Sequence, residues 1–153
     1  MSFAKLSLKG RALKLLAQRE HSRLELLRKL SPHVEDGDDL PAVLDELEKR
    51  GFISVERVVE SVIRSKAGRF GTARVLHDLR SKGLDDETVR QASEQLRGSE
   101  HARAWAVWQQ RFGSPAQTPQ ERMKQMRFLA SRGFGGDVVR KVVDKQQPPE
   151  EDF

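Results

Sequence analysis

The sequence predicts an all-α protein built from three tandem three-helix repeats. Apolar residues recur at intervals of three and four along nine successive segments, which is the spacing of amphipathic helices. No segment alternates apolar and polar residues over a length sufficient for a strand. In addition, a helical segment that ends at Gly83-Leu84 is matched, fifty positions later, by one that ends at Gly133-Phe134. A helix and its terminator that occur twice indicate a repeat protein.

The first repeat is expected over residues 5–51. Its first helix spans residues 6–19, because apolar residues recur there at helical spacing. Residues 22–25 form a capping box, in which a serine hydroxyl and a glutamate carboxylate bond to free amides, so the second helix begins there. A third helix spans residues 39–51 and ends at a glycine. The buried face of the second helix is expected to consist of Leu24, Leu27 and Leu30.

The second repeat is expected over residues 52–98. Ser54 is the expected N-cap of its first helix, whose valines recur at helical rather than alternating spacing. The second helix lies within residues 70–84 and ends at Gly83, because glycine readily adopts the left-handed conformation that terminates a helix. Three acidic residues from Asp85 onward complement the N-terminus of the third helix.

The third repeat is expected over residues 99–145. Two tryptophans three positions apart in its first helix favour core positions over the stacking of nucleic-acid bases. A second capping box at residues 118–121, with proline at the first helical position, begins the next helix. The last helix begins at Asp137. Residues 146–153 combine two prolines with three acids and are expected to form a disordered tail.

Composition and hydropathy indicate a cytoplasmic protein without membrane contact. The chain has no cysteine, which excludes disulfides and thiolate metal sites and favours a reducing compartment. No apolar run approaches the roughly 20 residues needed to cross a bilayer. The first residues lack the apolar core of a signal peptide.

The sequence contains no recognisable catalytic or cofactor motif. The four histidines lack both the i, i+4 spacing and the companion ligands of a zinc site. There is no phosphate-binding P-loop, no Gly-x-Ser-x-Gly nucleophile elbow and no cysteine nucleophile. The glycine-rich segment at residues 133–136 is typical of a turn between helices. We therefore expect neither an enzyme nor a metal or cofactor site.

Charge is distributed along the chain in blocks. Basic residues predominate in residues 1–30 and 61–84, and acidic residues predominate in residues 31–60. Such blocks fit either a basic surface for an anionic partner or neighbouring helices that attract one another. Guanidinium groups near helix ends bind phosphates and carboxylates equally well. The candidate residues for contact with an anionic partner are Arg69, Arg74, Arg80, Lys82, Arg127, Arg132, Lys9 and Arg11.

Several segments resemble the bacterial RecX regulatory proteins. The similarity includes residues 7–13, 19–26, 71–83 and 108–113, and it is most marked in residues 126–134, Met-Arg-Phe-Leu-Ala-Ser-Arg-Gly-Phe. The resemblance implies three tandem three-helix repeats in an elongated, curved array. It also implies a cytoplasmic monomer that binds the RecA recombinase and its filament on single-stranded DNA. By suppressing RecA activities, such a protein tunes recombination and the DNA-damage response.

Two functions remain open at the level of sequence. One is a non-enzymatic inhibitor that engages the RecA filament, with weak direct binding to DNA as an accompanying property. The other is a stand-alone DNA-binding regulator of the helix-turn-helix type, since such readers also use three-helix units. A sequence-specific reader makes base contacts of its own, whereas a filament binder tolerates any DNA sequence.

Overall fold

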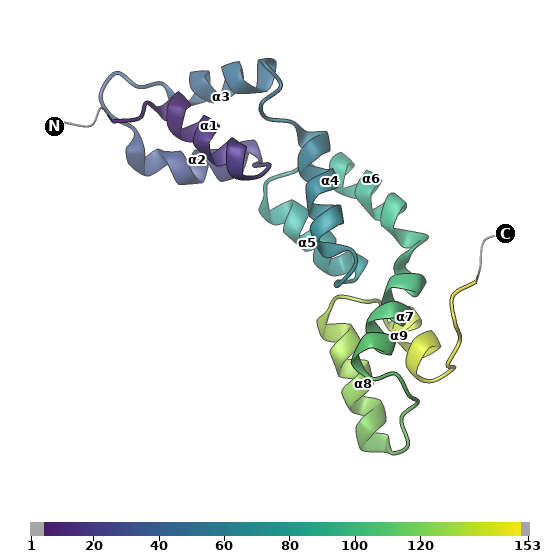
Figure 1. The fold of residues 1–153 in the computed structure, drawn as a ribbon. Coiled ribbons are helices and arrows are strands. Elements are labelled where there is room, and N and C mark those ends of the chain that lie inside the picture. Colours follow the sequence, from purple (N-terminus) through teal and green to yellow (C-terminus); the bar gives the residue numbers. More distant parts are fainter. Residues whose placement is uncertain (1–4, 151–153) are drawn as a thin grey trace. The chain divides into compact units, whose positions relative to one another are not determined.

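The protein is all-helical in a computed structural model that describes residues 5–150. This range contains nine α-helices, one short 3₁₀-helix and no strand (Figure 1). None of the described helices is both long and apolar enough to span a membrane. The prediction of an all-α fold is confirmed. The α-helices are α1 (Leu8–Gln18), α2 (Arg23–Leu30), α3 (Leu40–Lys49), α4 (Val55–Lys66), α5 (Thr72–Ser81), α6 (Asp86–Arg97), α7 (Glu100–Arg111), α8 (Pro119–Ser131) and α9 (Gly136–Val143), and the 3₁₀-helix η1 spans Ser31–His33.

The chain forms two compact units. The described part of the N-terminal unit comprises residues 5–61 and 81–84, and that of the C-terminal unit comprises residues 62–80 and 85–150. The division crosses the predicted second repeat, because α4 contributes residues to both units. The repeat boundaries after residues 51 and 98 therefore stay predictions.

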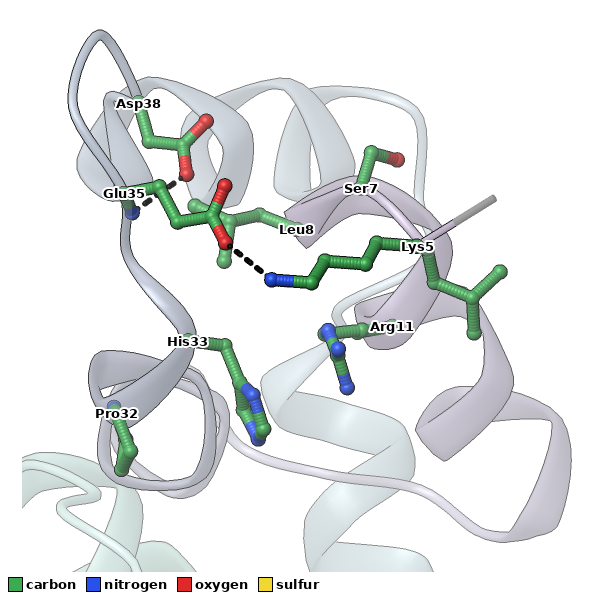
Figure 2. Close-up of a pocket in the computed structure, with 9 residues that line it drawn as sticks. Lys5, Ser7, Leu8, Arg11, Pro32, His33, Glu35 and Asp38 are labelled. Carbon is green, nitrogen blue, oxygen red and sulfur yellow. Dashed lines mark hydrogen bonds and ion pairs between the residues drawn. The ribbon is translucent and has the colours of Figure 1, made fainter. Parts of the chain in front are cut away.

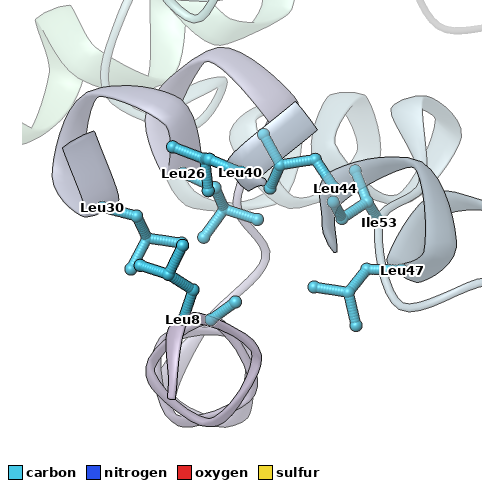
Figure 3. Close-up of a cluster of buried hydrophobic side chains, with 8 residues drawn as sticks. Leu8, Leu26, Leu30, Leu40, Leu44, Leu47 and Ile53 are labelled. Atoms are coloured by element: carbon cyan, nitrogen blue, oxygen red, sulfur yellow. The ribbon is translucent and has the colours of Figure 1, made fainter. Parts of the chain in front are cut away.

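A leucine-rich core lies between α1, α2 and α3 in the N-terminal unit (Figure 3). Leu26, Leu44 and Leu47 are completely buried there. Burial of a leucine side chain contributes roughly 1.5–3 kcal/mol, so this cluster is the main stabilising element of the unit. The core consists of Leu8, Ala12, Leu26, Leu30, Leu40, Leu44, Leu47 and Ile53.

The buried face of α2 differs from the predicted one. Leu26 and Leu30 lie in the core, whereas Leu27 is 38% exposed, so the prediction is wrong at Leu27. Leu24 is only partly buried and packs beside Gly83, in the turn after α5. The sequence of α2 has four leucines, which fit two neighbouring helical faces, and packing against α1 and α3 selects one of them.

The predicted start of α2 and the predicted end of α5 are confirmed. The hydroxyl of Ser22 accepts a hydrogen bond from the amide of Glu25, and the Glu25 carboxylate accepts one from the amide of Ser22. This is the complete capping box. Gly83 has a φ angle of +81°, the left-handed conformation expected for a glycine after the last helical turn.

Helices α7, α8 and α9 enclose the core of the C-terminal unit. Trp108 is 3% exposed, and its indole N–H donates a 3.0 Å hydrogen bond to the side-chain oxygen of Gln125. The ring of Trp105 lies 5.2 Å from that of Trp108. Trp108 is therefore a core residue with a satisfied polar atom, as the spacing of the tryptophans predicts. The core consists of Ala104, Val107, Trp108, Leu129, Phe134, Val139, Val142 and Val143.

Helix α8 begins with half of the predicted capping box. The hydroxyl of Thr118 accepts a 3.1 Å hydrogen bond from the amide of Glu121. The Glu121 carboxylate instead accepts a 2.7 Å hydrogen bond from the amide of Gln117, one residue before the cap. The side chain therefore stabilises the entering loop rather than the cap residue itself.

The residues directly after α9 bond to that helix. The side chain of Gln146 donates a 2.8 Å hydrogen bond to the carbonyl oxygen of Val142. The amide of Gln147 donates a 3.0 Å hydrogen bond to the carbonyl oxygen of Lys141. The predicted tail of residues 146–153 thus begins with two residues attached to α9, and residues 151–153 of it lie outside the described residues.

Candidate anion-binding site

Within the C-terminal unit, the loop before α5 touches the turn after α8. The amide of Gly71 donates a 2.7 Å hydrogen bond to the carbonyl oxygen of Arg132. A Cβ atom on Gly71 would lie 2.3 Å from backbone atoms of Gly133, and one on Gly133 would lie 2.6 Å from the Cβ of Arg74. Side chains other than hydrogen would prevent this approach. The contact therefore places Arg74 and Arg132 close together although they are distant in sequence.

Arg103 of α7 holds the same loop in place. Its guanidinium donates hydrogen bonds of 2.9 and 2.6 Å to the carbonyl oxygens of Ala67 and Phe70. It also donates to the Thr72 hydroxyl at 3.0 Å and to the carbonyl oxygen of Leu96 at 3.3 Å. Burial lowers the pKa of Arg103 from its ordinary value, but the group stays protonated at neutral pH. With its donors used internally, Arg103 positions the loop.

Four guanidinium groups lie over two phenylalanine rings. Three guanidinium carbons are 4.9, 5.3 and 5.5 Å from the centroid of Phe70. Two are 4.9 and 5.3 Å from the centroid of Phe128. Cation–π attraction contributes about 0.5–1 kcal/mol at exposed sites, so the rings help to orient the charges. This set, the arginine cluster, consists of Arg69, Arg74 and Arg132 around Phe70, and of Arg111 and Arg132 around Phe128.

The arginine cluster borders a hollow of about 390 Å³, lined by Arg69, Arg111 and Arg132 with Val107 and Phe128. Within residues 5–150, no ion pair joins any member of the cluster to a carboxylate, although arginines elsewhere on α6 and α8 form such pairs. Positive charges held close together without counter-charges repel one another, and an anion relieves that repulsion. The hollow is therefore a candidate anion-binding site.

The chemistry of the cluster suits phosphate or carboxylate groups better than nucleobases. A guanidinium presents a planar fork of donors to such anions. The two phenylalanine rings, in contrast, are already covered by arginines, and Phe112 approaches the ring of Phe128 edge-on at 5.5 Å. Little ring surface is left for base stacking. Within the part of the chain that the structure describes, no group of acidic and histidine side chains is placed to bind a metal ion.

The candidate residues of the C-terminal unit lie in two settings. Arg69, Arg74 and Arg132 meet in the arginine cluster. Arg80 and Arg127 are exposed on α5 and α8, and neither lines the hollow. The proximity of the first three supports a shared role, and the other two remain candidates on charge alone.

The candidate residues of the N-terminal unit are placed differently. The ammonium group of Lys82 lies 3.5 Å from the Glu25 carboxylate, and its side chain is 19% exposed. That of Lys9 lies 2.9 Å from the carboxylate of Glu46. These two lysines are thus neutralised within the fold. Arg11 lines a separate hollow between α1 and η1, shown in Figure 2.

Sequence reasoning missed Arg111 and Arg103. Arg111 is a basic residue in the last turn of a helix, a common arrangement that complements the helix dipole, so nothing distinguished it. For Arg103 a signal exists, because it stands four positions before the buried Val107 on the apolar stripe of α7. A charge on an apolar stripe indicates a buried group with internal hydrogen-bond partners.

Comparisons with known proteins agree with the fold. Residues 56–92 match the family model of the RecX second three-helix domain, and residues 99–143 match that of the third. The crystal structure of RecX from Lactobacillus salivarius has a TM-score of 0.73 at 18% identity, over 90% of this chain and 93% of that one. These matches confirm the prediction of tandem three-helix repeats.

Relatives in sequence are regulatory proteins. The regulatory protein RecX of Leptothrix cholodnii is 52% identical over 138 residues, which cover 90% of this chain and 88% of the relative. That of Ralstonia nicotianae is 48% identical over 90% of this chain and 87% of its own length. That of Herminiimonas arsenicoxydans is 40% identical over 99% of this chain and its own full length. The chain therefore belongs to the RecX family of regulatory proteins.

Proposed function

We propose that this protein binds the RecA recombinase and its filament on single-stranded DNA and inhibits RecA activities. The inhibited activities are ATP hydrolysis, strand exchange and co-protease function. The protein acts as a cytoplasmic monomer and without catalysis of its own. It thereby limits recombination and the DNA-damage response.

The arginine cluster is the structural observation that best supports this proposal. It offers several guanidinium groups that have no carboxylate partner among the described residues, in a chain whose relatives are regulatory proteins. A filament of protein on single-stranded DNA presents phosphates together with acidic side chains. Guanidinium groups bind both kinds of anion, and phosphate contacts are independent of base sequence. The cluster therefore suits a partner that is recognised along any DNA.

RecA-dependent ATP hydrolysis on circular single-stranded DNA tests the proposal. We expect hydrolysis to fall as this protein is added. In the same buffer, fluorescence anisotropy with a labelled oligothymidine measures its direct DNA binding. We expect this binding to be too weak to account for the inhibition. Unchanged hydrolysis at every protein concentration would contradict the proposal.

The same assays separate the proposal from a helix-turn-helix DNA reader. Such a reader binds one duplex sequence far more tightly than others, by roughly 10³-fold or more. We expect no comparable preference when duplexes selected from a random pool are compared. A strong preference together with unaffected RecA hydrolysis would favour the DNA-reader function.

A further inference from the structure

A third hollow, of about 260 Å³, lies in the N-terminal unit beside the one shown in Figure 2, and none of its lining residues belongs to the arginine cluster. Its apolar wall is formed by Leu6, Leu15 and Leu30, which come from the start of the described chain, from α1 and from α2. Leu6 is 50% exposed although it is a large apolar side chain. The volume is below the roughly 300–1,000 Å³ of small-molecule pockets. It admits one or two bulky side chains.

Positively charged and neutral polar groups surround this apolar wall. The lining contains Arg11, Lys14 and Lys29 and no carboxylate. Lys29 contacts the Nε2 atom of His21 at 3.1 Å, which leaves further ammonium protons available. Within residues 5–150, no ion pair joins these three side chains to an acid. The rim is therefore basic and unneutralised.

Of the residues that line this hollow and the neighbouring one, the acidic ones lie at the neighbouring hollow, which shares Leu6, Arg11 and His33 with this one (Figure 2). There Glu35 pairs with Lys5 at 3.2 Å. The side chain of Asp38 accepts a 2.8 Å hydrogen bond from the amide of Glu35. Lys5 neutralises Glu35, whereas no ion pair joins Asp38 to a base within the described residues, so Asp38 would repel an anionic ligand at that end. An acidic ligand is thus directed toward the end with Lys14 and Lys29.

We infer that this hollow, the basic groove, docks an acidic segment of a partner protein that inserts a bulky apolar side chain between the three leucines. Three leucines favour an aliphatic or aromatic side chain, while the lysines and Arg11 attract carboxylates. Nucleic acid fits less well, because its phosphates gain nothing from a wall of three leucines and the groove has no phenylalanine, tyrosine or tryptophan on which bases could stack. The site is separate from the arginine cluster and does not depend on the function proposed above.

Binding of a labelled peptide, Glu-Glu-Asp-Leu-Phe-Glu-Glu-Leu-Asp-Glu, to the full chain tests the inference by fluorescence anisotropy. We expect saturable binding that weakens as salt rises, because exposed charges are screened. A peptide with serine in place of its apolar residues should bind about tenfold more weakly. Either no saturable binding or equal binding of the two peptides would overturn the inference.

Two variants with matched controls locate the site. Lys14→Glu and Leu6→Ser should each weaken peptide binding about tenfold. Lys49→Glu makes the same charge change, and Leu27→Ser the same polarity change, at exposed positions of the same unit outside the groove. Both controls should bind as the unaltered chain does. Circular dichroism should show the same helical signal for all four variants.

Other occupants would appear as distinct results. If Lys14→Glu weakens binding of a labelled oligothymidine as much as that of the peptide, the groove is a nucleic-acid surface and the inference is wrong. If the protein self-associates in sedimentation experiments and Leu6→Ser abolishes this, a second copy occupies the groove, which also overturns it. Equal effects of the variants and their controls would show that the peptide binds elsewhere.

Discussion

At the scale of single residues, Glu25 links α2 to the turn after α5. Its carboxylate accepts a 2.6 Å hydrogen bond from Arg19 and one from the amide of Ser22, and it lies 3.5 Å from the ammonium group of Lys82. Burial alone would raise the pKa of Glu25. The hydrogen bonds from Arg19 and Ser22, together with the two cations, outweigh burial and lower the pKa to about 2.

This shift predicts acid sensitivity of the fold. Because the pKa of Glu25 is lower in the folded state, its contribution is present above pH 4.5 and is lost as the pH falls toward 2. Glu25→Gln removes charge-assisted hydrogen bonds and should reduce the free energy of unfolding at pH 7 by roughly 1.5–3 kcal/mol. Urea titrations from pH 7 to pH 2.5 should show a shallower pH dependence for the variant. Parallel curves for both proteins would contradict this account.

His21 adds a second acid-sensitive group. It is 1% exposed, its Nδ1 atom faces the carbonyl oxygen of Arg19 at 3.0 Å, and its Nε2 atom faces Lys29 at 3.1 Å. Burial lowers the pKa of His21 below 6.5, the hydrogen bond to Arg19 and the charge of Glu25 oppose this, and the charges of Arg19 and Lys29 reinforce it. The imidazole is therefore neutral in the folded protein at pH 7.

Stability should consequently fall as the pH drops below 6.5, because the unfolded chain then binds a proton that the folded chain excludes. His21→Gln should flatten the pH dependence of the melting temperature between pH 7 and pH 5. The pH dependence in that interval should survive in Glu25→Gln, whose lost group titrates at lower pH. An identical slope in His21→Gln and the unaltered protein would show that His21 is protonated without cost.

At the scale of elements, the starts and ends of helices could be predicted from the sequence more reliably than the faces that the helices bury. The capping box at Ser22 and the glycine terminator at Gly83 depend on neighbouring residues only, so their chemistry is local. The buried face of α2 depends on where α1 and α3 lie. The periodicity of its four leucines therefore could not distinguish Leu26 from Leu27 as the core residue.

Truncation of these two neighbouring leucines should have unequal effects. Leu26→Ala leaves a cavity at a fully buried position and should destabilise the protein by roughly 2–5 kcal/mol. Leu27→Ala removes a side chain that is 38% exposed and should change stability by less than about 1 kcal/mol. Chemical denaturation of both variants provides the comparison. Similar losses would mean that both side chains belong to the core.

The contact between the loop before α5 and the turn after α8 has an equally sharp test. Gly71→Ala places a methyl group 2.3 Å from the backbone of Gly133, which cannot move as a flexible side chain would. We expect a loss of at least about 3 kcal/mol, in the range of severe overpacking. Gly68→Ala, three residues earlier, meets nothing within 4 Å and should be nearly neutral. A Gly71→Ala variant as stable as Gly68→Ala would show that the two segments separate readily.

At the scale of the whole molecule, the two explanations of the charge blocks apply to different units. In the N-terminal unit, residues of the first block form ion pairs with oppositely charged residues of the second, and the pairs made by Lys9 and Arg23 join helices. The blocks were visible in the sequence, but the packing of the helices determines which charges are neutralised and which meet in the arginine cluster. Interblock pairs include Lys5–Glu35, Lys9–Glu46, Arg23–Asp45 and Arg57–Glu20.

Reversal of charges in the arginine cluster should therefore weaken inhibition of RecA and leave the stability of the fold nearly unchanged. The double variant Arg69→Glu with Arg111→Glu reverses two exposed charges, and each change should alter stability by no more than about 1 kcal/mol. Arg64→Glu with Arg97→Glu makes the same charge change at exposed positions of the same unit outside the cluster. The cluster variant should need at least about tenfold more protein than the control to halve RecA-dependent ATP hydrolysis, a difference equivalent to 1.4 kcal/mol.

Salt provides the internal check on this last prediction. Inhibition by the unaltered protein should weaken as salt rises, because counterion release and screening both favour dissociation. The cluster variant should show a shallower salt dependence, since it makes fewer contacts with anionic groups, and the control variant should match the unaltered slope. If the cluster variant inhibits as well as the control at every salt concentration, these arginines are solvated side chains. The exposed Arg80 and Arg127 would then be the next residues to reverse.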